Sequence, residues 1–141
     1  MALRQQQATL TDAQLRFLAE NPFVGVLTTL RRDGSPHSTV VWVDVEDGQV
    51  SFNTEEGRAK VRHLDDDPRV SLLVADPSDP YKWVAISGAT DITTEDAREQ
   101  IDRLAKKYLG QDEYPWASPD KRRLKVLIQP AHVDSSGFDG G

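Results

Sequence analysis

Three cations lie close together in the segment NTEEGRAKVRHLDDDPR, which covers residues 53–69: Arg58, Lys60 and Arg62. The chain has 141 residues and a formal net charge of -6, so this excess of positive charge is local. Cations in the first turn of a helix, beside its free backbone N–H groups, can bind a phosphate. The same residues also suit a solvated helix, and two glutamates just before them bring negative charge to the same end. The residue types alone leave both interpretations open.

The spacing of the three cations decides which of them could share a ligand. We expect Asn53 or Thr54 to cap the helix, since both are good N-cap residues. With Arg58 in the first turn, Arg58 and Lys60 can flank one anion, and Thr54 can add a hydroxyl donor. Arg62 then points elsewhere. A phosphate site therefore predicts unequal roles for the three cations.

Other kinds of catalytic site find little support. The chain has no cysteine, which excludes disulfides and thiolate metal sites. Its three histidines, His37, His63 and His132, are far apart and lack metal-ligand spacing, so no metal is expected. Neither a Gly-x-Ser-x-Gly nucleophile motif nor a Walker-type phosphate loop is present. We assign no catalytic residue, and any reaction should depend on a cofactor.

Composition also limits the partners and the location. A net negative charge disfavours non-specific binding to nucleic acid or to anionic membranes. No apolar run approaches the roughly 20 residues that span a bilayer. The first ten residues, MALRQQQATL, lack the apolar core of a signal peptide. We therefore expect a cytoplasmic protein with neither nucleic acid nor membrane as a partner.

The elements that must position the cations are mostly strands. Apolar and β-branched runs alternate with turn residues, whereas three segments show helical spacing of apolar residues. No linker divides the chain, so residues 1–141 are expected to form one domain. The expected strands cover 23–30, 38–46, 50–54, 69–76, 81–94 and 121–136; the expected helices cover about 11–20, 54–65 and 94–110, and a flexible tail covers about 135–141.

The connections favour a particular architecture. Asp-Gly turns at 33–34 and 47–48 are short enough to join only antiparallel neighbours, so the first three strands should form a meander. Alternating strand–helix–strand units are absent. The sequence thus predicts a mainly β fold with short helices, a closed or nearly closed antiparallel β-barrel.

Three stretches in this order carry a family resemblance: GVLTTLRRDGSPHSTVVWV, NTEEGRAKVRHLDDDPRVSLLV and WVAISGATDIT. Together they resemble the pyridoxamine 5′-phosphate oxidase-like family, and within it the small oxidoreductases that use a flavin or the deazaflavin coenzyme F-420. The resemblance covers roughly residues 10–134. It implies a six-stranded antiparallel split β-barrel of the FMN-binding type. It also implies a homodimer with the cofactor in the groove between subunits.

The resemblance also implies the site residues. It places the cofactor phosphate on Arg58 and Lys60, with Asn53 and Thr54 beside them. A strand near Trp83 could complete the groove. The residues expected along the cofactor ring are Ser38, Thr39, Val40 and Val41.

The function implied is hydride transfer from reduced coenzyme F-420 to a small conjugated organic acceptor. An FMN-dependent oxidoreductase on the same fold is the alternative, and a non-catalytic flavin or deazaflavin carrier is a third possibility. The C-terminal sequence VLIQPAHVDSSGFDGG lacks the basic, tryptophan-containing segment of true pyridoxamine phosphate oxidases, which argues against vitamin B6 oxidation. Trp42 and Trp83 suit core or dimer packing better than ring stacking. Trp116 suits surface packing better than a lid.

Overall fold

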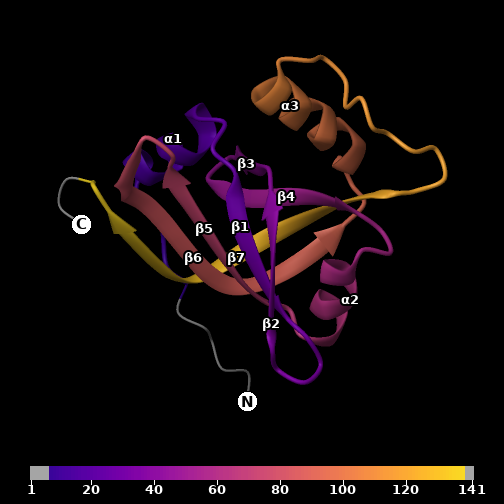
Figure 1. Ribbon diagram of the computed structural model, residues 1–141, viewed down its shortest axis with the longest axis horizontal. Coiled ribbons are helices and arrows are strands. Elements are labelled where there is room, and N and C mark those ends of the chain that lie inside the picture. The colour runs from indigo at the N-terminus through magenta and orange to yellow at the C-terminus, as the bar shows by residue number, and fades with distance from the viewer. Residues whose placement is uncertain (1–6, 139–141) are drawn as a thin grey trace.

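The computed structural model describes residues 7–138. Seven strands and three short helices make up the fold (Figure 1). In chain order they are α1 (Asp12–Glu20), β1 (Gly25–Leu30), β2 (Pro36–Val41), β3 (Val43–Glu46), β4 (Gln49–Glu55), α2 (Ala59–Asp66), β5 (Arg69–Asp76), β6 (Asp79–Thr93), α3 (Ala97–Leu109) and β7 (Arg123–Ser136).

All seven strands belong to one antiparallel sheet in the order β2-β1-β5-β6-β7-β4-β3. Strands β2 and β3 lie at opposite edges of this sheet, yet a single residue, Trp42, separates them in the chain. The sheet must therefore curl until its two edges meet at Trp42. The curled sheet is the split β-barrel predicted from the sequence, with seven strands in place of six.

The extra strand arises where we expected one continuous strand over residues 38–46. The apolar pattern runs on through Trp42, but the chain there leaves the β1 edge and joins the β4 edge. The predicted three-strand meander was therefore wrong. Each Asp-Gly turn does close an antiparallel hairpin, but the two hairpins lie at opposite edges of the sheet.

The core fills the inside of the curled sheet. Leu27, Phe52, Leu72, Val126 and Ile128 are completely buried there. Helix α1 packs on β3, α2 on β1, and α3 on β7 and β3. In Figure 1, α1 and α3 lie above the sheet and α2 lies beside it.

Two helix boundaries follow from local chemistry. Thr11 and Gln14 form a capping box that starts α1, since each side chain accepts from the other residue's backbone N–H. Helix α3 buries Ile101, Leu104 and Ala105 on one face and ends at Gly110, which has a φ of 72°. This is the helix that its apolar spacing predicts.

The start of α2 differs from the prediction. Strand β4 continues through Glu55, so Asn53 and Thr54 are buried strand residues and do not cap the helix. They pair with Lys125 and Leu124 of β7, and this ladder outweighs their preference for a helix cap. The N-cap of α2 is Arg58.

The end of the chain also differs from the prediction. Strand β7 runs through Ser136, which pairs with Trp83, so residues 135–136 belong to the sheet. Residues 139–141 of the predicted tail lie outside the described part of the chain.

Candidate cofactor-binding site

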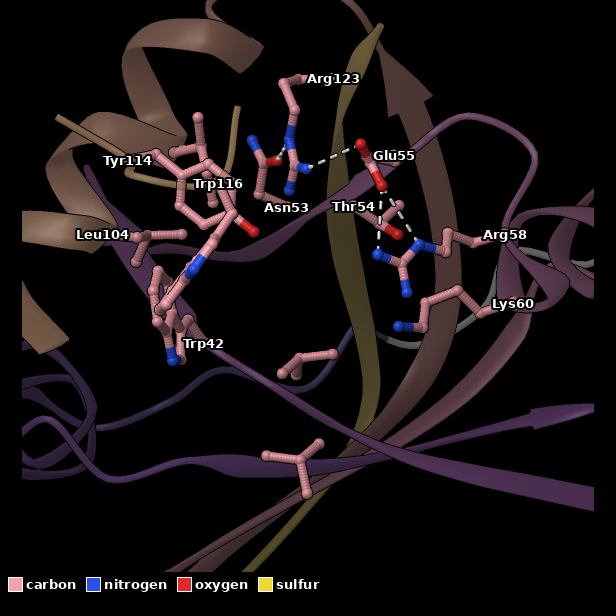
Figure 2. Close-up of a pocket in the computed structure, with 13 residues that line it drawn as sticks. Trp42, Asn53, Thr54, Glu55, Arg58, Lys60, Leu104, Tyr114, Trp116 and Arg123 are labelled. Carbon is pink, nitrogen blue, oxygen red and sulfur yellow. Dashed lines mark hydrogen bonds and ion pairs between the residues drawn. The ribbon is translucent and has the colours of Figure 1, made fainter. Parts of the chain in front are cut away.

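A cavity of about 190 Å³ lies where the two edges of the sheet meet, between β4, α3 and the start of α2 (Figure 2). Cationic side chains line one side of it and aromatic side chains line the other. The lining residues are Val40, Val41, Trp42, Asn53, Thr54, Glu55, Arg58, Lys60, Ile101, Leu104, Tyr114, Trp116 and Arg123.

The cationic side of the cavity is the start of α2. Arg58 is the N-cap, and the first intrahelical hydrogen bonds come from the N–H groups of Val61 and Arg62 to its carbonyl oxygen. The N–H groups of Ala59 and Lys60 therefore have no acceptor within the helix. No acidic residue lies in the first turn of α2, so no side chain within that turn offsets the positive end of the helix dipole.

Lys60 and Arg58 differ in how their charges are balanced. The Arg58 guanidinium pairs with Glu55 at 3.1 Å. Lys60 is half-buried and makes no ion pair with any described residue. Burial lowers the pKa of Lys60, and the positive charges of Arg58 and Arg123 lower it further. A second anion at this position would relieve this unfavourable environment.

Arg123 is the third cation of the cavity. Its Nε donates to Asn53 Oδ1 at 2.8 Å, and its Nη1 lies 3.9 Å from Glu55 Oε2. Burial is the main cause of the lowered pKa of Arg123. The amide of Asn53 in turn donates to Ala97 O (2.7 Å) and Gln100 Oε1 (3.0 Å), so both ends of this amide are bonded within the protein. Asn53 thus fixes the position of Arg123.

This donor set fits a small phosphate. Arg58 and Lys60, at the N-terminal turn of α2, line a cavity whose one lining carboxylate is Glu55, and the N–H groups of Ala59 and Lys60 in the same turn have no acceptor within the helix. Phosphate oxygens accept both kinds of donor, and the dipole of α2 adds to the attraction. Arg62 does not take part, because it is exposed and its Nη1 donates to Gly57 O (2.7 Å).

The structure brings together six of the nine predicted site residues. Val40, Val41, Asn53, Thr54, Arg58 and Lys60 all line the cavity.

The other three predicted residues lie elsewhere. Ser38 is exposed and bonds to Thr28 at 2.9 Å, while the buried Oγ1 of Thr39 has no partner among the described residues. Trp83 lies in the first half of β6, opposite Ala75 of β5 and Ser136 of β7, and does not line the cavity.

The sequence reasoning did not identify Arg123, Glu55 and the aromatic side of the cavity. The Lys-Arg-Arg run at 121–123 and Trp116 are visible in the sequence, but their residue types favour solvated charge for the run and surface packing for Trp116. The signal that could have found Arg123 is the alternation of β7. Leu124, Val126 and Ile128 are buried on one face of this strand, so Arg123 must lie on the other face. Which side of that strand meets α3 depends on the tertiary fold.

Two features are absent from the described residues, 7–138. Within this range no cluster of three or more His, Cys, Asp or Glu side chains is placed to hold a metal ion. The helices of the same range are too short or too polar to cross a bilayer.

Comparisons with known proteins identify relatives of the whole chain. A biliverdin reductase of Mycobacterium tuberculosis that depends on reduced coenzyme F-420 is 29% identical over 137 residues, which are 94% of this chain and 93% of the relative. The structure of an F-420 reductase is 25% identical, has a TM-score of 0.72 and matches 84% of this chain and 94% of its own. A conserved hypothetical protein of M. tuberculosis is also 25% identical, with a TM-score of 0.71 over 95% of this chain and 89% of its own.

The family profile for pyridoxamine 5′-phosphate oxidase matches residues 10–134. This match covers most of the sequence. It includes all the described strands, except for the last two residues of β7. The chain therefore belongs to the pyridoxamine 5′-phosphate oxidase family.

Proposed function

We propose that this protein is an oxidoreductase that binds reduced coenzyme F-420 and reduces a small conjugated organic acceptor. One observation carries the proposal. Lys60 is a half-buried cation without an ion-pair partner among the described residues, beside Arg58 at the free N-terminus of α2. This is the environment that a phosphate stabilises, in a chain whose relatives include a biliverdin reductase that depends on reduced F-420 and an F-420 reductase.

The residues of the cavity would divide the work of binding. Arg58, Lys60 and the N–H groups at the start of α2 hold the phosphate, and Thr54 adds a hydroxyl. Asn53 acts indirectly, because its amide orients Arg123. The strand over residues 38–41 carries the ring, with Val40 and Val41 forming the part of the surface that lines the cavity.

The size of the cavity favours a second subunit. About 190 Å³ is below the range of roughly 300–1,000 Å³ typical of ligand sites, so one chain encloses only part of a cofactor. We therefore include a homodimer in the proposal. Trp83, which does not line the cavity of its own chain, would complete the groove of the other subunit.

An apolar surface for this dimer lies on the outside of the sheet. Val26 is paired with Val40 on β2 and with Leu73 on β5, and all three side chains point away from the core. Their exposed fractions are 41%, 62% and 42%. Contiguous exposed apolar side chains of this kind mark interaction sites, and the same Val40 lines the proposed cofactor groove.

The protein's contribution to the reaction is positioning. When bound, the reduced coenzyme supplies a hydride, and a proton from water completes the two-electron reduction of the acceptor. The cavity has no arrangement of a nucleophile and a base. Its residues hold the phosphate, align the ring and exclude water around the acceptor. By analogy with the M. tuberculosis relative, biliverdin is the first acceptor to test.

The test is titration of the purified protein with F-420 and with FMN side by side, followed by turnover of reduced F-420 with biliverdin. We expect tighter binding of F-420 and consumption of reduced F-420 only with acceptor present. Arg58→Ala should weaken binding about ten- to a hundredfold, whereas Arg62→Ala, a change of the same charge on the same helix, should not. Tight FMN binding without F-420 binding would replace the proposal by the FMN enzyme. Binding without turnover on a broad set of acceptors would favour a carrier.

A further inference from the structure

The aromatic side of the cavity is a continuous wall of three side chains, which we call the aromatic wall: Trp42, Tyr114 and Trp116 (Figure 2). The rings of Trp42 and Tyr114 lie 6.0 Å apart at 84°, and those of Tyr114 and Trp116 lie 5.6 Å apart at 78°. These edge-to-face contacts are the favoured geometry of aromatic pairs. The three residues come from two distant parts of the chain and meet only at this cavity.

Trp42 is held rigidly in this wall. Its ring stacks on Tyr108 of α3 at 5.2 Å and 7°. The hydroxyl of Tyr108 is fixed by two backbone contacts, since it donates to Phe23 O (2.8 Å) and accepts from Val43 N (2.9 Å). Burial raises the pKa of Tyr108 to about 12, so the hydroxyl keeps its proton at neutral pH. The wall is therefore formed before any ligand arrives.

The loop between α3 and β7 supplies the other two rings. Tyr114 is anchored to α3, because its backbone N donates to Asp102 Oδ1 at 2.9 Å. The guanidinium of Arg123 lies 5.1 Å from the centre of the Tyr114 ring. Trp116 is 63% exposed and contacts the ring of Tyr114. A large aromatic side chain that lines a cavity while so exposed has apolar area available to cover a ligand.

Arg123 adds a charge to this wall. Its Nε is taken by Asn53, but its Nη1 is 3.9 Å from Glu55, beyond hydrogen-bond reach. Arginine has four Nη–H donors in a planar fork that matches a carboxylate. Because Glu55 also pairs with Arg58, one carboxylate serves two guanidinium groups. A second carboxylate is therefore favoured at Arg123.

We propose that the aromatic wall and Arg123 form the acceptor subsite, and that the acceptor is a planar conjugated molecule carrying a carboxylate. The inference rests on the proposed function, which lays the cofactor ring along Val40 and Val41. Trp42 directly follows Val41, so a molecule against the aromatic wall lies next to that ring. Hydride transfer needs such contact, with the reacting atoms about 3–3.5 Å apart. A flat π-system matches the rings, and a carboxylate matches the guanidinium.

The test uses biliverdin, which carries two carboxylates, and its uncharged dimethyl ester as probes. Each is titrated by visible absorbance into the protein without coenzyme, and F-420 binding is titrated separately. Trp116→Ala should weaken the binding of both probes about tenfold, the loss of one aromatic contact, and leave F-420 affinity within about twofold. Arg123→Gln should weaken biliverdin about tenfold while leaving the ester nearly unchanged. Tyr81→Ala, which removes another exposed aromatic ring that does not line the cavity, is the matched control and should change nothing.

The outcomes separate this inference from the function on which it rests. If the wild-type protein fails to bind F-420, the proposed function fails, while the probe titrations still judge the subsite because they contain no coenzyme. If Trp116→Ala and Arg123→Gln weaken F-420 and leave the probes unchanged, the wall belongs to the cofactor and the inference is wrong. Absence of probe binding to the wild-type protein also overturns it.

Discussion

Replacement of Lys60 by methionine should make the free protein more stable and the cofactor complex weaker. Lys60 is half-buried, and its lowered pKa reports an unfavourable environment for its charge. Burial is the first cause and repulsion by Arg58 and Arg123 the second. Methionine keeps the length and the apolar stem of the side chain and removes the charge. A residue that lowers the stability of the free protein is typical of a binding site.

The magnitudes follow from the contacts. Loss of one charge-assisted hydrogen bond to phosphate removes about 1.5–3 kcal/mol, so Lys60→Met should weaken F-420 about ten- to a hundredfold. The gain in the free energy of unfolding should be about 0.5–1 kcal/mol, because solvent screens a half-exposed cation. For a domain of this size that gain raises Tm by about 1–4 °C.

The pH dependence gives a second signature of the same residue. The pKa of Lys60 in the free protein lies below 10.5, and a bound phosphate raises it. The complex therefore holds more protons than the free protein in this range, and F-420 affinity falls as pH rises through the free-protein pKa of Lys60. The Lys60→Arg variant stays charged over this pH range, so its affinity for F-420 should not fall there.

The assay is fluorescence titration of F-420 into each variant, together with thermal unfolding of the free protein. Arg62→Met is the control, since Arg62 lies on the same helix but outside the cavity. A Lys60→Met variant that loses stability and keeps its affinity would refute the assignment of Lys60 to the phosphate.

Three further predictions concern the fold and the assembly. Leu73→Glu should convert the proposed dimer to a folded monomer in sedimentation at micromolar concentration, whereas Leu109→Glu, of similar exposure outside the apolar surface, should not. Gly88→Ala should lower the free energy of unfolding by at least about 1–3 kcal/mol in urea titrations, because its Cβ would collide with the backbone carbonyl of Gln129 at the β-bulge. Burial lowers the pKa of Lys107 to about 8, so the free energy of unfolding should rise with pH between about 8 and 10; Lys107→Met should remove that rise.

Much of the fold could be predicted because its signals are local. Strand β5 covers Arg69–Asp76, as predicted. Its residues alternate between buried and exposed, and Asp-Pro turn sequences mark both of its ends. The turns at Gly34 and Gly48 have φ angles of 88° and 78°, which explains why glycine marks them. Helix α3 follows its apolar spacing.

The errors arose where a distant partner decides. Nothing in the pattern around Trp42 marks the switch from one sheet edge to the other, because both halves read as the same kind of strand. Asn53 and Thr54 look like helix caps, and only their pairing with a strand about 70 residues later in the chain keeps them in the sheet. Arg58 and Lys60 could be predicted from the sequence, because they lie two positions apart in the chain and a shared phosphate site needs no distant residue. Arg123 could not, because its position depends on the fold.

The charge distribution explains how an acidic chain can select a phosphate compound. With a formal net charge of -6, the protein's overall field repels polyanions, whose binding depends on many spaced cations. At the cavity the balance is reversed, since Arg58, Lys60 and Arg123 face one carboxylate, Glu55. The reversal is confined to one helix end, where Arg58 and Lys60 flank the proposed phosphate site, and to one strand start, where Arg123 lies beside Tyr114. In the proposed complex a cofactor places its phosphate there and keeps its ring on Val40 and Val41.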